Sequence, residues 1–169
     1  FFKKDAATTN LYRINTSTVF VGGYSAGAFM GLHYGYINND NEILDIGGND
    51  LLNHVNSNGG LNGNSGNSGF NNNIKGVINI AGALLKANHV NANEPILYSI
   101  HGTDDNVVPY LIGDSDNTGV ITEGSGLIHP VADSVGIVNF LHTVQGGGHD
   151  ALGECDCQAE LRNFIFQNL

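Results

Sequence analysis

The stretch FVGGYSAGAFM, residues 20 to 30, decides how the rest of the sequence is interpreted. Residues 18 to 22 are β-branched, apolar or Gly, which predicts a short buried strand. Residues 26 to 37 have helical length and contain no proline, which predicts a helix. Ser25 therefore lies at the point where a strand turns into a helix.

Ser25 stands between Gly23 and Gly27, in a G-x-S-x-G pattern. Glycine is so abundant in this chain that the bare pattern is expected by chance about 0.2 times. Its position is more informative, because a tight strand-to-helix turn lifts a serine hydroxyl clear of a sheet. We expect both glycines to be needed because side chains there would collide with the strand and the helix. The alternative is a glycine-rich turn with a serine that caps the helix.

Composition limits the possible functions. The chain has 169 residues, enough for one domain with a real core, and 41% of them are hydrophobic. Six Lys and Arg against a net charge of -10 leave no basic surface for nucleic acid or for an anionic membrane. No apolar run approaches the length of about 18 residues that a membrane span needs.

Further strands and helices alternate along the chain. The pattern predicts strands at 75–82, 94–102 and 139–145, a short helix at 129–136 with Pro130 in its first turn, and a final helix at 158–169. The final helix is amphipathic, with Leu161, Phe164 and Ile165 on one face. The alternation predicts an α/β fold with a mostly parallel sheet of about four strands, flanked by helices.

Residues 47–73 are dominated by Gly, Asn and Ser. This composition predicts a loop or insertion of low complexity within a single domain that spans residues 1–169.

Two carboxylates follow the predicted strand at 94–102, in the segment IHGTDDNVVPY. Asp104 and Asp105 lie in the loop where that strand ends, and we expect His101 to shape this loop. A serine nucleophile needs a base, and the base needs an acid to orient it. For an isolated Asp-Asp-Asn sequence the alternative is a turn held by local hydrogen bonds.

His149 follows the last predicted strand, in the segment QGGGHD. Three glycines before it allow a close-packed turn. A lone histidine is more often structural than catalytic. Here serine, acid and histidine arrive in that order, each just past a strand, and this order on an α/β pattern is typical of serine hydrolases.

The segments VFVGGYSAGAF, IHGTDDNVVPY and TVQGGGHD resemble those of the α/β-hydrolase superfamily. Within it they are most similar to bacterial carboxylesterases near the feruloyl esterases and polyhydroxybutyrate depolymerases, over about residues 1 to 169. The resemblance implies that Ser25 is the nucleophile and His149 the general base. It implies Asp105 as the acid, with Asp104 as the fallback, and the Ala26 N–H as an oxyanion donor.

The resemblance further implies a serine carboxylesterase that hydrolyses short-chain or aryl esters through an acyl-enzyme, without metal or organic cofactor. Tyr24 and Tyr110 flank the site, where they would line a substrate pocket or simply be partly buried. One alternative is a hydrolase of a polyester or a feruloylated polysaccharide. Another is a hydrolase-fold subunit with impaired catalysis that binds a ligand or a partner.

Members of this superfamily place further strands before the nucleophile strand, and a loop there supplies a second oxyanion donor. Nothing before Thr18 fits that strand and loop. The chain is then either the C-terminal part of a longer hydrolase or a protein that completes its site by association. An exposed strand edge near residues 18–22 predicts pairing with another chain, such as a homodimer. The resemblance favours export to the periplasm or beyond.

Cys155 and Cys157 are separated by one residue. We expect free thiols, with a strained disulfide as the alternative. Two thiols are too few for a tetrahedral zinc site unless histidines contribute. The remaining histidines show no metal-ligand spacing, so no metal site is predicted; they are His33, His54, His89, His101, His129 and His142.

Overall fold

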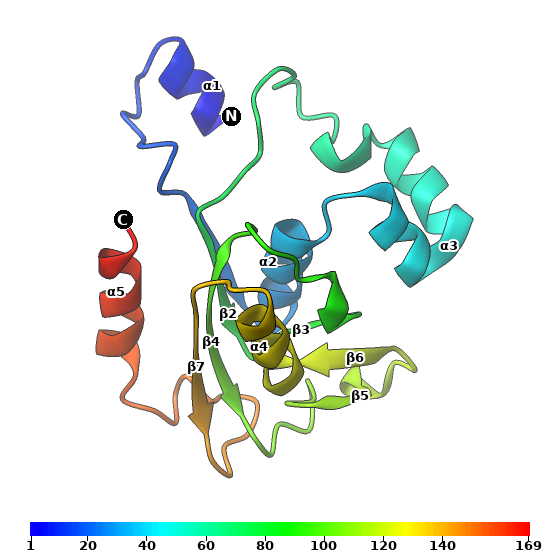
Figure 1. Cartoon of the computed structure of the whole chain (residues 1–169), viewed down its shortest axis with the longest axis vertical. Coiled ribbons are helices and arrows are strands. Elements are labelled where there is room, and N and C mark those ends of the chain that lie inside the picture. The colour runs from blue at the N-terminus through cyan, green and yellow to red at the C-terminus, as the bar shows by residue number, and fades with distance from the viewer.

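A four-stranded parallel sheet forms the centre of the computed structural model, which describes residues 1–169 (Figure 1). Its strands are β1 (Phe20–Tyr24), β2 (Gly76–Ile80), β4 (Ile96–Gly102) and β7 (Asn139–Val144), in the order β1-β2-β4-β7. All three pairings are parallel. The predicted α/β class with a mostly parallel sheet of about four strands is therefore confirmed.

Helices cover both faces of this sheet. On one face, α2 (Ala26–Tyr36) packs on β1 and β2, and α4 (Ser125–Ser134) packs on β4 and β7. On the other face lies α5 (Gln158–Gln167), to the left in Figure 1. The two buried cores correspond to these faces; they include Leu32, Val77, Leu97 and Ile128 on the first, and Ile78, Tyr98, Ile100 and Phe164 on the second.

The strand register brings the carboxyl ends of the strands to one edge. Tyr24 at the end of β1 pairs with Ile80 at the end of β2. Gly102 at the end of β4 pairs with Val144 at the end of β7. The segments that follow β1, β4 and β7 therefore emerge side by side, as in other open parallel sheets whose sites lie at this edge.

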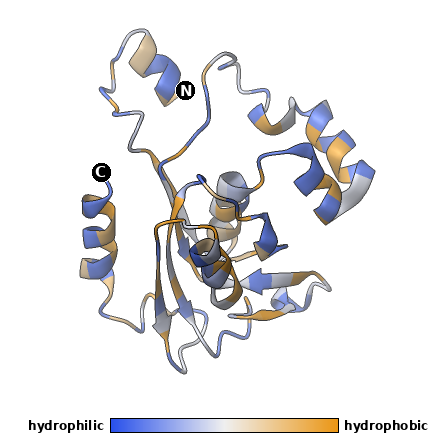
Figure 2. Cartoon of the chain, in the orientation of Figure 1, coloured by the Kyte–Doolittle hydropathy of each residue, from blue (hydrophilic) through white to orange (hydrophobic).

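Helix α5 shows the predicted amphipathic pattern. Phe164 is buried in the second core, and Leu161 and Ile165 pack against it. Figure 2 shows hydrophobic and hydrophilic positions alternating along this helix, as expected for one face on a sheet and one in water.

Helix α4 begins earlier than the sequence predicts. It runs from Ser125 to Ser134, so Pro130 lies inside it and not in its first turn. A proline at this position removes one backbone N–H from the helix ladder. The sequence GSG at 124–126 carries no helical signal, which is why the start at 129 was wrong.

The prediction of a loop over 47–73 is wrong for its first part. Helix α3 runs from Asp40 to Ser57, with a non-helical kink at Gly48. It begins with a capping box in which the Asn39 side chain accepts from Glu42 N–H and the Glu42 carboxylate accepts from Asn39 N–H. Residues beyond it form mainly turns, with a 3-10 turn η1 (Gly60–Asn62).

Several small elements carry no clear sequence signal. A second, antiparallel sheet has the order β3-β6-β5, from β3 (Ala83–Leu84), β5 (Ile112–Asp114) and β6 (Ile121–Gly124). The N-terminal helix α1 covers Phe2–Ala7, and two further 3-10 turns are η2 (Ala87–His89) and η3 (Ser115–Asn117). These segments are too short for a hydrophobic period to emerge.

Strand β1 lies at the edge of the parallel sheet, with β2 as its single neighbour. One side of its backbone therefore has no strand partner within the chain. Pairing of this edge with another chain, as in a homodimer, stays a prediction. None of the helices has both the length and the apolar character that crossing a membrane would take.

The expectation of free cysteines is wrong, because Cys155 and Cys157 form a disulfide. The chain bends between them so that their Cα atoms lie 5.3 Å apart. This separation is within the usual range for disulfides, about 4.4 to 6.8 Å.

His101 and His129 are buried and His33 is partly buried, and we expect these three histidines to make the stability of the fold depend on pH. Burial lowers the pKa of His33, His101 and His129 below the ordinary value of 6.5. Below pH 6.5 the unfolded chain therefore takes up protons that the folded chain does not, so acid favours unfolding. Above this pH the free energy of unfolding should keep its full value. Below it, the free energy of unfolding should fall by up to about 1.4 kcal/mol per pH unit for each histidine.

Urea unfolding between pH 8 and pH 5 measures this dependence. His129→Gln should reduce the slope, whereas the same change at the exposed His54 should not. A free energy of unfolding that stays constant or rises on acidification over this range would contradict the prediction.

Candidate active site

Ser25 occupies an unusual backbone conformation between β1 and α2. Its φ is 53° and its ψ is -119°, in a region that residues other than glycine rarely adopt. The turn is held because Ser25 N–H donates to Ile80 O at 2.9 Å and Ser25 O accepts from Ala28 N–H at 2.9 Å. Such strain persists only where the surroundings enforce it, and it is common at functional sites.

Gly23 and Gly27 differ in whether the structure has room for a side chain. A Cβ on Gly23 would lie 2.3 Å from the Gly27 carbonyl carbon, so the turn has no room for one. A Cβ on Gly27 would meet nothing within 4 Å. The expectation that both positions need glycine is therefore wrong for Gly27, whose missing side chain would point into open space.

In the structure, Ser25, His149 and Asp105 are joined by two consecutive hydrogen bonds. The Ser25 Oγ lies 2.9 Å from His149 Nε2, and His149 Nδ1 lies 2.8 Å from Asp105 Oδ2. A carboxylate only accepts, so His149 Nδ1 carries the proton and Nε2 is free to accept from the serine hydroxyl. The three residues come from the segments after β1, β4 and β7, which the register places side by side.

The two neighbouring carboxylates have different surroundings. The Asp105 side chain is fully buried, and its Oδ1 accepts from the N–H groups of Val107 and Val108, both at 2.9 Å. Asp104 is exposed, and its carboxylate accepts from the Thr103 hydroxyl at 3.2 Å. The geometry thus places Asp105, and not the fallback Asp104, beside His149.

His101 lies next to the carboxylate of Asp105. Its Nε2 lies 3.0 Å from Val108 O and 3.3 Å from Asp105 Oδ2. Both partners are acceptors, so Nε2 carries the proton and Nδ1 accepts from the Ser125 hydroxyl at 2.8 Å. Burial lowers the pKa of His101, which favours the neutral ring.

A buried polar network continues from Ser125 into the sheet. The Asn79 amide donates to Ser125 Oγ at 3.0 Å and to Ser99 Oγ at 2.9 Å, and its carbonyl oxygen accepts from Gly82 N–H. Sequence reasoning missed this network. The available signal was a polar residue inside each of two mainly apolar strands, Asn79 in β2 and Ser99 in β4.

The glycines before His149 pack against the acid loop. A Cβ on Gly102 would lie 2.1 Å from Gly147 O, and Asp104 N–H donates to that same oxygen at 2.9 Å. Gly148 N–H donates to Glu154 Oε2 at 3.0 Å. Close backbone contact between the two loops therefore fixes the distance between Asp105 and His149.

Of the two flanking tyrosines, Tyr24 lies beside His149 and Tyr110 lies beside His101. Tyr24 is 45% exposed, and its ring centre is 5.1 Å from that of His149. Desolvation and the Asp150 carboxylate raise the pKa of Tyr24, so its hydroxyl is a neutral donor. Tyr110 packs edge-on against His101, and its hydroxyl bonds to Thr143 Oγ1 at 3.0 Å.

The Ala26 N–H is the first of helix α2 and directly follows Ser25. The first N–H groups of a helix have no partner inside it, and the helix dipole adds partial positive charge at this end. An oxygen that gains negative charge beside Ser25 would be stabilised here.

Two larger hollows lie elsewhere in the molecule. They have volumes of about 1300 Å³ and 770 Å³. Both are bordered by the N-terminal segment, α2 and part of residues 59–75, and the first also by α3 and residues 93–96. None of Ser25, Asp105 and His149 lines either of them, so they are not part of the candidate site.

No protein-family model matches the sequence, and no curated protein does so significantly. Solved structures that share the fold include two esterases. A truncated form of a carbohydrate esterase from gut microbiota has a TM-score of 0.66 and 17% identity, over 99% of this chain and 64% of that one. Esterase PE8 has a TM-score of 0.50 and 22% identity, over 94% of this chain and 57% of that one. The chain thus spans less than two thirds of either protein and has the fold of esterase structures.

Proposed function

We propose that this chain is a serine carboxylesterase of the α/β-hydrolase type. The hydrogen-bonded line from Ser25 through His149 to Asp105 carries the proposal. It combines a nucleophile, a base and an orienting acid, which is the arrangement that activates a serine hydroxyl. The fold shared with two esterase structures supports it.

The mechanism follows from the protonation states. His149 Nε2 takes the Ser25 proton as Oγ attacks the ester carbonyl carbon. The alcohol leaves with a proton returned by His149, and an acyl-Ser25 ester remains. Water then attacks this ester, again losing its proton to His149, and the carboxylic acid departs. The buried Asp105 carboxylate stabilises the imidazolium that forms in both steps.

The Ala26 N–H is our candidate for one oxyanion donor. The second donor of this superfamily comes from a loop before the nucleophile strand, whereas the residues before β1 contain helix α1 and no strand. Loss of one donor typically lowers kcat by about 10² to 10³. We therefore expect slow turnover unless another segment or chain supplies the second donor.

An ester attached to a carbohydrate is the second candidate substrate. The exposed ring of Tyr24 beside His149 favours it, because a flat aromatic surface suits both a sugar ring and an aryl acyl group. One of the solved structures that share this fold is named a carbohydrate esterase. Higher kcat/KM on a feruloylated or acetylated oligosaccharide than on a simple aryl ester would favour this candidate.

Turnover of p-nitrophenyl butyrate is the test of the function. We expect saturable release of p-nitrophenol, with an initial burst of about one equivalent per chain if deacylation is the slower step. Activity no faster than buffer, in a folded protein, would contradict the esterase proposal. It would favour the alternative of a hydrolase-fold subunit that binds a ligand or a partner.

A further inference from the structure

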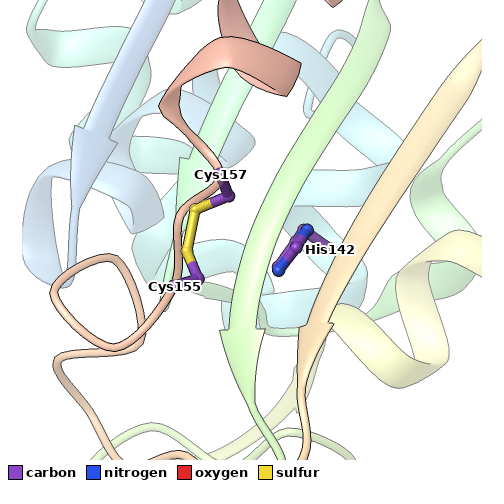
Figure 3. Close-up of side chains that lie close together, drawn as sticks. All are labelled: His142, Cys155 and Cys157. Atoms are coloured by element: carbon purple, nitrogen blue, oxygen red, sulfur yellow. A yellow bond between two sulfur atoms is a disulfide. The ribbon is translucent and has the colours of Figure 1, made fainter.

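A second cluster of reactive side chains lies away from Ser25, between β7 and α5. His142 reaches from β7 toward Cys155 and Cys157, which lie just before α5 (Figure 3). One ring nitrogen of His142 and the two sulfur atoms all lie within 4.8 Å of one another. In the structure the two sulfurs are joined as a disulfide.

His142 is held as a metal-binding histidine would be. Its Nδ1 lies 2.9 Å from Glu160 Oε1, and the same oxygen accepts from the Tyr98 hydroxyl at 2.8 Å. Because a carboxylate only accepts, Nδ1 carries the proton and the lone pair of the neutral ring is on Nε2. Metal-binding histidines commonly donate their other N–H to a carboxylate in this way, which fixes the ring and makes it more basic.

We propose that the reduced cysteines and His142 form a binding site for Zn²⁺. Two thiolates and an imidazole are a donor set typical of zinc, with a fourth position left for water. An external dithiol would reduce the Cys155–Cys157 disulfide by thiol–disulfide exchange. The dithiol is oxidised to a disulfide, and Cys155 and Cys157 become two thiols. Binding of Zn²⁺ then releases both thiol protons.

The surroundings allow an ion to enter. Cys157 is 1% exposed and packs in the core that contains Ala151 and Phe164. Cys155 is partly buried, and the His142 side chain is 29% exposed, so the ion would enter from their side. Tetrahedral coordination with Zn–S bonds of about 2.3 Å needs the two sulfur atoms about 3.8 Å apart. The short segment that carries both cysteines would therefore have to open slightly.

The site would close the base of the loop that carries His149. This loop leaves β7 after Val144 and returns through Cys155 and Cys157 to α5. The disulfide and the zinc site are thus two alternative cross-links. The disulfide joins the cysteines to each other, whereas zinc would join both cysteines to His142 on β7. The proposal does not depend on the esterase function, because binding is measured directly.

The test compares metal binding by the reduced and the oxidised chain. Protein is reduced with a dithiol, freed of reductant without oxygen and titrated with Zn²⁺ against a chromophoric chelator. We expect one equivalent to bind the reduced chain and none to compete with the chelator in the oxidised chain. With Co²⁺ as the probe, the reduced chain should show thiolate-to-cobalt charge-transfer absorption.

Matched variants locate the ligands. Cys155→Ser and His142→Gln should each abolish competition with the chelator, while Glu160→Gln should weaken binding by about 10- to 100-fold. His54→Gln, an exposed histidine elsewhere, should bind as the unchanged chain does. Circular dichroism checks that each variant is folded. Equal zinc affinity of the reduced and oxidised chains, or of the reduced chain and its His142→Gln variant, would overturn the proposal.

Discussion

Ser25→Ala should lower the kcat for p-nitrophenyl butyrate by about 10⁴-fold or more. The variant keeps the turn but has no Oγ for His149 Nε2 to deprotonate, so no acyl-enzyme can form. Any residual rate would come from water activated by His149 and from binding alone. Steady-state kinetics with matched protein concentrations measure the loss.

Ser65→Ala is the matched control, because Ser65 is exposed in the segment between η1 and β2. It should have the kcat of the unchanged chain. Equal esterase activity in Ser25→Ala and the unchanged chain would show that another group carries the reaction.

Asp105→Asn should have the second largest effect, a fall in kcat of about 10⁴-fold. The amide oxygen can still accept from Val107 and Val108 N–H, so the loop should keep its shape. The amide nitrogen then donates to His149 Nδ1, which places the ring proton on Nε2. A protonated Nε2 cannot accept the proton of Ser25.

The neighbouring carboxylate supplies the control for this substitution. Asp104→Asn removes the same charge one residue away, at an exposed position, and should leave kcat close to that of the unchanged chain. The two variants are compared at the same pH and the same protein concentration. Equal losses in both variants, or a larger loss in Asp104→Asn, would contradict the assignment of Asp105.

The parallel sheet and the positions of Ser25, Asp105 and His149 could be predicted because their signals are local. Each of these residues lies in the segment that follows a mainly apolar strand, and parallel strands bring such ends to one edge. The sequence could not show that glycine is needed at Gly23 and not at Gly27, because this depends on where a Cβ would point. Only the structure shows that Gly23 contacts the backbone of Gly27.

Other features depend on long-range contacts. The hydrogen bonds from Asn79 to Ser99 and Ser125 join residues 20 and 46 positions apart. Helix α3 was missed because its Gly, Asn and Ser content resembles a loop, while its start depends on the capping box at Asn39 and Glu42. The pairing of Cys155 with Cys157 depends on a local bend that a spacing of two residues does not reveal.

Covalent labelling with a fluorophosphonate ester, which reacts with activated serines, tests most directly whether Ser25 is the nucleophile. We expect a single adduct per chain, located at Ser25 by peptide mass spectrometry and lost when His149 is replaced by alanine. Absence of an adduct in the folded chain, or an adduct on another serine that persists in Ser25→Ala, would contradict the assignment of Ser25 as the nucleophile.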